Sequence, residues 1–270
     1  MSRWSYLRYL VFVRSWLEKF GAACTRFFYH AGGISLLFCD TVVLIFKKDI
    51  RWKMVLAQMY KIGVTSLPLV FLTSLFTGMV LALQSAYQLK LFAAEQFMSD
   101  LVSLSMTREL GPVLTAMVVA GRVGASIAAE LGTMKVTEQV DALKALSTNP
   151  VSYLVVPRFI AGIFMLFILT IYADWIGMFG GWLIGVFKIG ISSHIYLKRA
   201  MNVLMVKDIL TGLIKAFFFG GVIAVVGCYY GFKARGGAEG VGRATTQAVV
   251  VSLIMIIASD ALFTAIFYFL

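Results

Sequence analysis

The sequence predicts an all-α fold, that of a polytopic helical membrane protein, and three observations indicate this class. Of the 270 residues, 60% are hydrophobic, and the mean hydropathy is +0.89, whereas soluble domains are just under half apolar. Several apolar runs reach twenty residues or more, the length that a helix needs to cross a bilayer. The runs lack the polar–apolar alternation of barrel strands, so helices are the spanning structure to expect. We predict five transmembrane helices, an N-terminal interfacial helix and a short polar helix on the cytoplasmic side.

Residues 1–54 are predicted to form a basic interfacial segment, separate from a membrane domain over residues 55–270. Residues 1–26 interleave aromatic and basic side chains, which is typical of a helix lying on the membrane, although a poorly ordered tail would have the same composition. Residues 32–46 are apolar but too few to span, and Asp40 interrupts them. An interfacial or half-inserted helix is therefore expected there.

Positive charge is concentrated near the N-terminus. Ten of the 24 basic residues lie in the first 61 positions, against three acidic ones. By the positive-inside rule this excess places the N-terminus in the cytoplasm. The net charge of +11 would also suit nucleic acid, but in so apolar a chain it favours an anionic lipid surface, and no nucleic-acid partner is expected.

The five predicted spans follow one another from residue 62 to the C-terminus. They cover residues 62–85, 97–129, 153–187, 209–231 and 244–270. With the N-terminus inside, residues 87–99 and 188–208 become outer connections, and the C-terminus lies outside. The connection 188–208 carries four basic residues, against the positive-inside rule. The topology is kept because the N-terminal excess usually dominates.

Two opposite charges and a proline lie within the second span. Pro112 has no N–H, so the carbonyl of Arg108 loses its helical partner, and a kink or a free carbonyl is expected there. Arg108 and Glu109 point about 100° apart on a helix, so each needs a partner of its own. Charges inside a membrane mark candidate functional sites because they are costly to leave unpaired. The alternative is that both side chains merely anchor the helix at the headgroup level.

Small residues recur every four positions along the same span. Such rows let helix backbones approach closely in lipid. The sequence leaves two interpretations open, packing within one subunit or an interface between subunits. The first row is Ala116, Ala120, Gly124, Ala128 and Gly132, and the second is Gly121, Ala125 and Ala129.

Residues 135–146 are predicted to form a short polar helix between the second and third spans. Val136, Val140, Leu143 and Leu146 are spaced by four, three and three residues, which gives one apolar stripe. The segment is too short and too charged to span, and Asn149-Pro150 ends it. An amphipathic helix joined to two long spans is the arrangement expected where a membrane domain contacts a soluble partner.

Motifs for cofactors are absent from the sequence. Three scattered cysteines and two isolated histidines match neither a zinc site nor a disulfide framework. Residues 232–243 are glycine-rich and basic and are predicted to form a cytoplasmic turn. Their GGAEGVG run resembles a phosphate loop only superficially, since it follows no strand and the chain contains no GxxxxGKS or GxxxxGKT. We expect no cofactor, no metal and no ATP hydrolysis by this chain alone.

Four runs of the sequence together resemble the MlaE/YrbE family. They extend over most of the chain from about Gly63 to the C-terminus, and they are long and specific. The runs are MTRELGP at 106–112, AGRVGASIAAELGTMKVTEQVDAL at 120–143, NPVSYLVVPR at 149–158 and GGAEGVGRATTQAVV at 236–250.

The resemblance implies a function and a set of partners. Members of that family are membrane permeases of ABC transporters that move phospholipids together with MCE-domain proteins, energised by a separate cytoplasmic ATPase. A small STAS-type accessory subunit is a further partner to look for. The resemblance makes the polar helix the coupling helix that seats in the ATPase, and it places Arg108 and Glu109 at the lipid cavity. The coupling residues carried over are Glu138, Gln139, Val140, Asp141, Ala142 and Leu143.

Other functions and locations remain to be weighed. An intramembrane lipid-modifying enzyme would need a nucleophile or a paired acid and base, and Asp174, Asp260 and His194 fall in no recognisable catalytic spacing. A passive membrane scaffold is the third class. Because an ABC transporter forms its ATP sites between two ATPase subunits and this chain offers one coupling helix, a homodimer is expected. The predicted location is a bacterial inner membrane, with a plastid inner envelope as the alternative.

Overall fold

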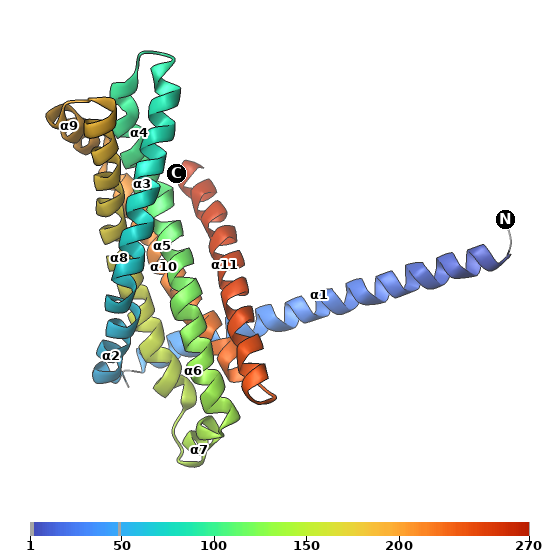
Figure 1. The fold of residues 1–270 in the computed structure, drawn as a ribbon. Coiled ribbons are helices and arrows are strands. Elements are labelled where there is room, and N and C mark those ends of the chain that lie inside the picture. The colour runs from blue at the N-terminus through green and yellow to red at the C-terminus, as the bar shows by residue number, and fades with distance from the viewer. Residues whose placement is uncertain (1–2, 48–49, 270) are drawn as a thin grey trace.

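Long helices packed side by side form the body of the protein in the computed structural model (Figure 1). The structure describes residues 3–47 and 50–269, and the side chains of residues 3–20, 23 and 27 lie outside that description. Every regular element in these residues is a helix. The α-helices are α1 (Arg3–Phe46), α2 (Trp52–Ile62), α3 (Leu67–Lys90), α4 (Met98–Ser105), α5 (Gly111–Val119), α6 (Ala125–Val136), α7 (Gln139–Ala145), α8 (Val156–Ile184), α9 (Ser193–Val203), α10 (Val206–Lys233) and α11 (Gly237–Phe269).

Short 3₁₀ and π turns join several of these helices into longer rods. A 3₁₀ turn leads into α3 and another into α4, and π turns lie at both ends of α5, before α8 and after α8. The rod from α4 to α6 therefore continues well past the predicted end at residue 129. The turns are η1 (Val64–Ser66), η2 (Glu95–Phe97), η3 (Met106–Leu110), η4 (Ala120–Gly124), η5 (Val151–Val155) and η6 (Gly185–Ile189).

Six helical stretches of the described residues are long and apolar enough to cross a membrane. Five of them contain the five predicted spans, apart from residue 270, which lies outside the described residues. The sixth falls where a shorter interfacial or half-inserted helix was predicted. The stretches are Cys24–Phe46, Trp52–Lys90, Glu95–Val136, Val151–Ile189, Val206–Lys233 and Gly237–Phe269.

The helix α1 is longer than the sequence pattern suggests. Asp40 does not interrupt it, because the residue is exposed on the helix surface, where a charged side chain is tolerated. In Figure 1, α1 leaves the bundle sideways, at a steep angle to the other long helices. His30 fastens it to the bundle, with Nδ1 3.2 Å from the hydroxyl of Tyr229 on α10. An interfacial position for the N-terminal segment remains a prediction, and its aromatic and basic side chains before residue 21 lie outside the described residues.

Glycines allow the central helix α8 to pack closely against α3 and α10. A side chain at Gly78 would collide with the backbone carbonyl of Gly177, and one at Gly220 with that of Gly162. The first row of small residues on the α4–α6 rod is also buried inside this one subunit. Gly124 faces Ile223 of α10, so that row serves packing within the subunit.

Two predicted boundaries are wrong. The polar helix 135–146 is split, because Glu138 adopts a left-handed conformation with φ of 61°, so that α6 ends at Val136 and α7 begins at Gln139. Leu146 lies outside α7 and is exposed. The glycine-rich segment 232–243 is mostly helical, since α10 runs to Lys233 and α11 starts at Gly237. Only three residues link them, which brings α10 and α11 together as an antiparallel pair.

Candidate functional site

A buried lysine, Lys215 on α10, is the centre of a charged cluster between the apolar helices. Its side chain is 1% exposed, and all three of its N–H bonds have acceptors. Nζ donates to Glu109 Oε2 at 2.5 Å, to Thr264 Oγ1 at 2.8 Å and to the carbonyl of Arg108 at 3.3 Å. It also forms an ion pair with Asp260 Oδ1 at 2.9 Å. We call these residues, with Asp208 described below, the Lys215 pocket.

The break in the α4–α6 rod explains why Lys215 can reach a backbone carbonyl. The turn η3 precedes α5, and Pro112 stands in the first turn of α5. Because proline has no N–H, the carbonyl of Arg108 is free of the helical ladder. The ammonium of Lys215 takes the place of the missing donor. The carbonyl that Pro112 leaves without its α-helical donor thus accepts a hydrogen bond from a neighbouring helix.

Arg108 and Glu109 have separate partners, as their angular spacing predicts. Glu109 faces Lys215 and also accepts a hydrogen bond from the hydroxyl of Thr264 at 3.1 Å. Arg108 pairs with Asp208, with Nη2 2.6 Å and Nε 2.7 Å from Oδ1. Asp208 Oδ2 in turn accepts from the backbone N–H of Met205, at the start of α10. This carboxylate is thus held by two elements while the guanidinium of Arg108 stays half exposed.

The cluster opens into a pocket of about 250 Å³. Its walls come from the π turn η3, the first turns of α10 and the end of α11. Counted with Asp260, the residues around this opening include three cations, Arg108, Lys207 and Lys215, and three carboxylates, Glu109, Asp208 and Asp260. Such a balanced set can exchange an internal ion pair for one with a ligand without leaving a net charge in the bilayer. Arg108, with planar donors exposed to the pocket, is suited to phosphate.

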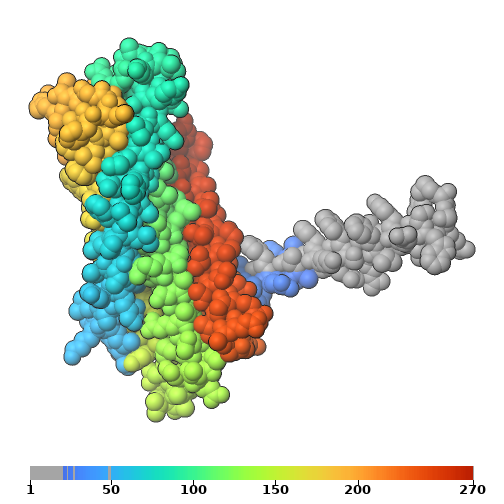
Figure 2. Space-filling view, in the orientation of Figure 1, coloured from blue at the N-terminus to red at the C-terminus, as the bar shows by residue number. Residues whose placement is uncertain are grey.

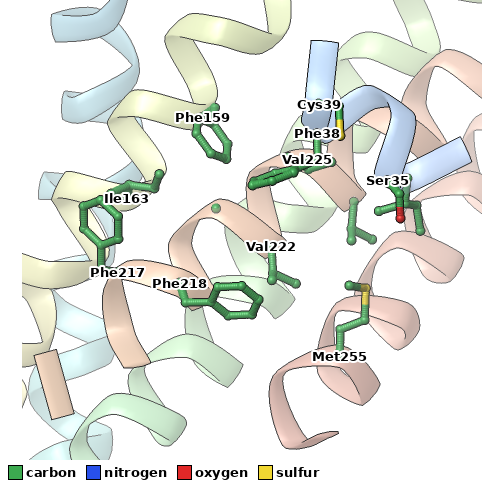
Figure 3. Close-up of a pocket in the computed structure, with 13 residues that line it drawn as sticks. Ser35, Phe38, Cys39, Phe159, Ile163, Phe217, Phe218, Val222, Val225 and Met255 are labelled. Carbon is green, nitrogen blue, oxygen red and sulfur yellow. The ribbon is translucent and has the colours of Figure 1, made fainter. Parts of the chain in front are cut away.

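A second, apolar pocket of about 340 Å³ lies between α1, α8, α10 and α11 (Figure 3). Phe38 of α1, Phe159 of α8 and Met255 of α11 help to line it. Along α10, Phe218 and Val222 of this pocket lie three and seven residues after Lys215. One face of α10 therefore runs from charged to apolar.

The other candidate site, the coupling segment, lies at the opposite end of the bundle. Figure 2 shows α7 at this extremity, far from α9. Val140 is buried and Leu143 half-buried, so these two hold α7 on the bundle. The remaining four coupling residues are exposed: Glu138, Gln139, Asp141 and Ala142.

Salt links fix the orientation of α7. Asp141 accepts from Lys135 Nζ at 2.7 Å and from Lys144 Nζ at 3.4 Å. The hydrogen bond from Lys135 holds the pKa of the Asp141 carboxyl below its usual value. The ionised Asp141 thus ties α7 to Lys135 in the last turn of α6. The result is a short helix with a defined exposed face.

Comparison with known proteins identifies the family. A family model described as Permease MlaE matches residues 55–266. The chain belongs to the MlaE permease family. It is 46% identical to a probable ABC transporter permease protein of Rickettsia felis, over 92% of this chain and 96% of that one.

Two further relatives of this MlaE-family chain come from different settings. The intermembrane phospholipid transport system permease protein MlaE of Haemophilus influenzae is 39% identical over 83% of this chain and 87% of its own. The protein TRIGALACTOSYLDIACYLGLYCEROL 1, chloroplastic, of Arabidopsis thaliana is 36% identical over 90% of this chain and 70% of its own. The MlaE-family chain is a multi-pass membrane permease, a transport subunit rather than an enzyme.

The sequence interpretation of this MlaE-family chain found only two residues of the Lys215 pocket. It singled out Arg108 and Glu109, but assigned no partner to either and passed over Lys215. Asp260 was considered as a catalytic candidate, together with Asp174 and His194, and not as a partner of Glu109 or Lys215. The available signal was Lys215 itself, a basic residue in an apolar span, which is by default a candidate functional residue.

Proposed function

We propose that this chain is the permease subunit of an ABC transporter that moves phospholipids between membranes, energised by a separate ATPase. The observation that carries the proposal is the Lys215 pocket, a polar, charge-balanced cavity built among apolar helices. A phospholipid has the same division, a charged headgroup joined to apolar tails. The name of the relative from Haemophilus influenzae, an intermembrane phospholipid transport permease, supports the same substrate class.

The lipid headgroup would bind at Arg108 and Glu109. The phosphate would compete with Asp208 for Arg108, whose guanidinium is half exposed to the pocket. Glu109, which is 39% exposed, could receive a cationic headgroup amine while Lys215 keeps its other acceptors. Because the headgroup competes with ion-pair partners inside the protein, the site could both bind and release an amphiphile.

The ATPase would dock on the coupling segment. Val140 and Leu143 anchor α7 to the bundle, while Glu138, Gln139 and Asp141 face outward. A short, stiff helix between two long rods is suited to pass a rotation of the soluble partner to the membrane domain. The rickettsial relative, named as a probable ABC transporter permease protein, supports a partner of this class.

The direct test is ATPase activity in lipid nanodiscs. The purified permease, the ATPase and the two together would be measured with and without phospholipid. We expect no hydrolysis by the permease alone and lipid-dependent hydrolysis by the pair. Robust hydrolysis by the lone permease would contradict the proposal, and a partner indifferent to the permease would favour a passive scaffold.

We further propose that two copies of the chain form a homodimer. The second row of small residues is the surface that suits it, since Gly121 is exposed and a side chain there would meet nothing within 4 Å, with Ala125 and Ala129 half-buried beside it. The helix α11 also offers an open face, because only 11% of its most apolar stretch is buried. Native mass spectrometry should show two permease chains per complex, and a single chain would contradict this assembly.

The remaining partners and the location are proposals that rest on the family. An MCE-domain protein would carry lipid onward at the α9 end, and a STAS-type subunit would be an accessory at the ATPase. The location proposed is a bacterial inner membrane, and a plastid inner envelope is the alternative that the Arabidopsis thaliana relative keeps open. Co-purification in mild detergent, with identification of bound proteins and lipids, would test the partners.

A further inference from the structure

A second charged cluster, at the α7 end, ties three spans together around one carboxylate. Glu130 lies on α6, about 9 Å of helix before the break that leads to α7. Its Oε2 is 3.1 Å from Nη2 of Arg158 on α8, and its Oε1 is 3.5 Å from Nζ of Lys61 on α2. We call Lys61, Glu130 and Arg158 the Glu130 clamp.

Arg158 is the buried member of the clamp. Its side chain is 3% exposed, against 39% for Glu130 and 60% for Lys61. Its Nη1 also donates to the carbonyl of Leu154 at 2.7 Å, in the turn η5 that follows the α7 segment. Arg158 therefore holds both the helix entering α7, through Glu130, and the chain leaving it.

The clamp is continuous with contacts on either side. Toward α7, Lys135 on the same α6 helix binds Asp141 at 2.7 Å. Toward α3, Arg122 donates to Ser66 Oγ at 2.7 Å and to the carbonyl of Lys61 at 2.9 Å, and so fixes the turn between α2 and α3. The cavity at this junction is only about 30 Å³. The cluster is thus filled, and it has no room for a ligand of any size.

We propose that the Glu130 clamp relays movement of α7 to α2, α6 and α8 together, so that Glu130 and Arg158 are positioning residues for coupling. This inference rests on the proposed function of the permease. Without the clamp, the left-handed residue Glu138 and the irregular segment 146–149 would act as hinges and absorb the displacement of α7. With the clamp, α6 and α8 move as one body, and Lys61 brings α2 with them.

The principal variants remove the charges but keep the volume. Glu130→Gln retains an acceptor for Arg158, and Glu130→Gln with Arg158→Met replaces the ion pair by uncharged side chains of similar size. Replacing both members of a buried pair is often neutral for stability, whereas Glu130→Gln alone leaves the buried Arg158 without a counter-charge and should lower the unfolding temperature. The matched control is Arg243→Gln, which removes an exposed ion pair with Glu239 near the start of α11.

The measurements are complex yield with the ATPase, unfolding temperature, ATP hydrolysis and lipids moved per ATP in proteoliposomes. We expect both clamp variants to assemble and hydrolyse ATP like the unmodified protein, while lipids moved per ATP fall by about five-fold or more, the range of measurable coupling effects. The control variant Arg243→Gln should move as many lipids per ATP as the unmodified protein.

Two results would overturn the inference. One is an unchanged number of lipids moved per ATP in a clamp variant that assembles. The other is failure of both clamp variants to assemble, because the pair would then hold the fold and not relay movement. If the unmodified permease itself fails to stimulate the ATPase, it is the proposed function that fails, and this outcome is visible without any variant.

Discussion

The two charged clusters of the protein use the same residue types and differ in what surrounds them. At the Lys215 pocket the lysine is buried, while its partner Glu109 and the neighbouring Arg108 reach an opening of about 250 Å³. At the Glu130 clamp the arginine is buried, but the adjoining cavity is only about 30 Å³. The pocket can therefore exchange partners with a ligand, whereas the clamp can only hold helices together.

The difference teaches that intramembrane charge does not by itself mark a binding site. Both clusters join three separate helices or turns, and both contain a cation with almost no exposed surface. What separates them is the space beside the charges, a pocket of about 250 Å³ at Arg108 and Lys215 and a cavity of about 30 Å³ at Lys61 and Glu130. Removing charges should therefore have different consequences at the two places.

The largest effect is expected at Lys215. Lys215→Met would leave the carboxylates of Glu109 and Asp260 without their shared cation, and because both are partly exposed the cost should lie at or below the lower end of the range of about 3–5 kcal/mol for a fully buried pair. We expect a marked fall in unfolding temperature and in yield. Adding Glu109→Gln and Asp260→Asn should restore stability but not bound phospholipid. Recovery of lipid binding in this triple variant would contradict a role of the pocket in lipid recognition.

A smaller effect on stability, but a large one on transport, is expected at Arg108. Arg108→Ala leaves Asp208 with its hydrogen bond from Met205, and because Arg108 is half exposed the loss of its pair should cost about 1 kcal/mol. Transport and co-purified phospholipid should fall well below those of the matched control Lys188→Gln, an exposed lysine at the same end. Unchanged transport and bound lipid would favour an anchoring role at the headgroup level.

The smallest effect on the fold is expected at the coupling segment. Glu138→Lys with Asp141→Lys changes two exposed side chains and breaks only surface ion pairs, which contribute little to stability. Unfolding temperature and bound lipid should therefore stay close to normal, while the ATPase is released or no longer stimulated by lipid. Normal complex yield together with normal transport would show that the assignment of α7 is wrong.

Much of the fold could be predicted because the bilayer constrains the sequence directly. Each span must be a long apolar helix, so the five predicted spans are confirmed as parts of long helices. The positions at which helices end or begin were harder to predict. The split at Glu138 depends on one left-handed residue, and the helical start at Gly237 depends on packing against α6, where Gly132 contacts Val241. Helix propensity favours a continuous helix through Glu138, and the glycines around Gly237 favour a turn. The sequence pattern therefore predicts the wrong structure at both positions.

The sequence by itself determined the helical class, the spans, the free carbonyl at Arg108 and the need of Arg108 and Glu109 for separate partners. These follow from apolar length, from the missing N–H of proline and from helix geometry, which are all local. Only the tertiary structure decided which partners those are, since Asp208 and Lys215 lie about a hundred residues further along the chain. Tertiary structure alone also separated the open Lys215 pocket from the closed Glu130 clamp, because the space around a charge depends on how distant helices pack.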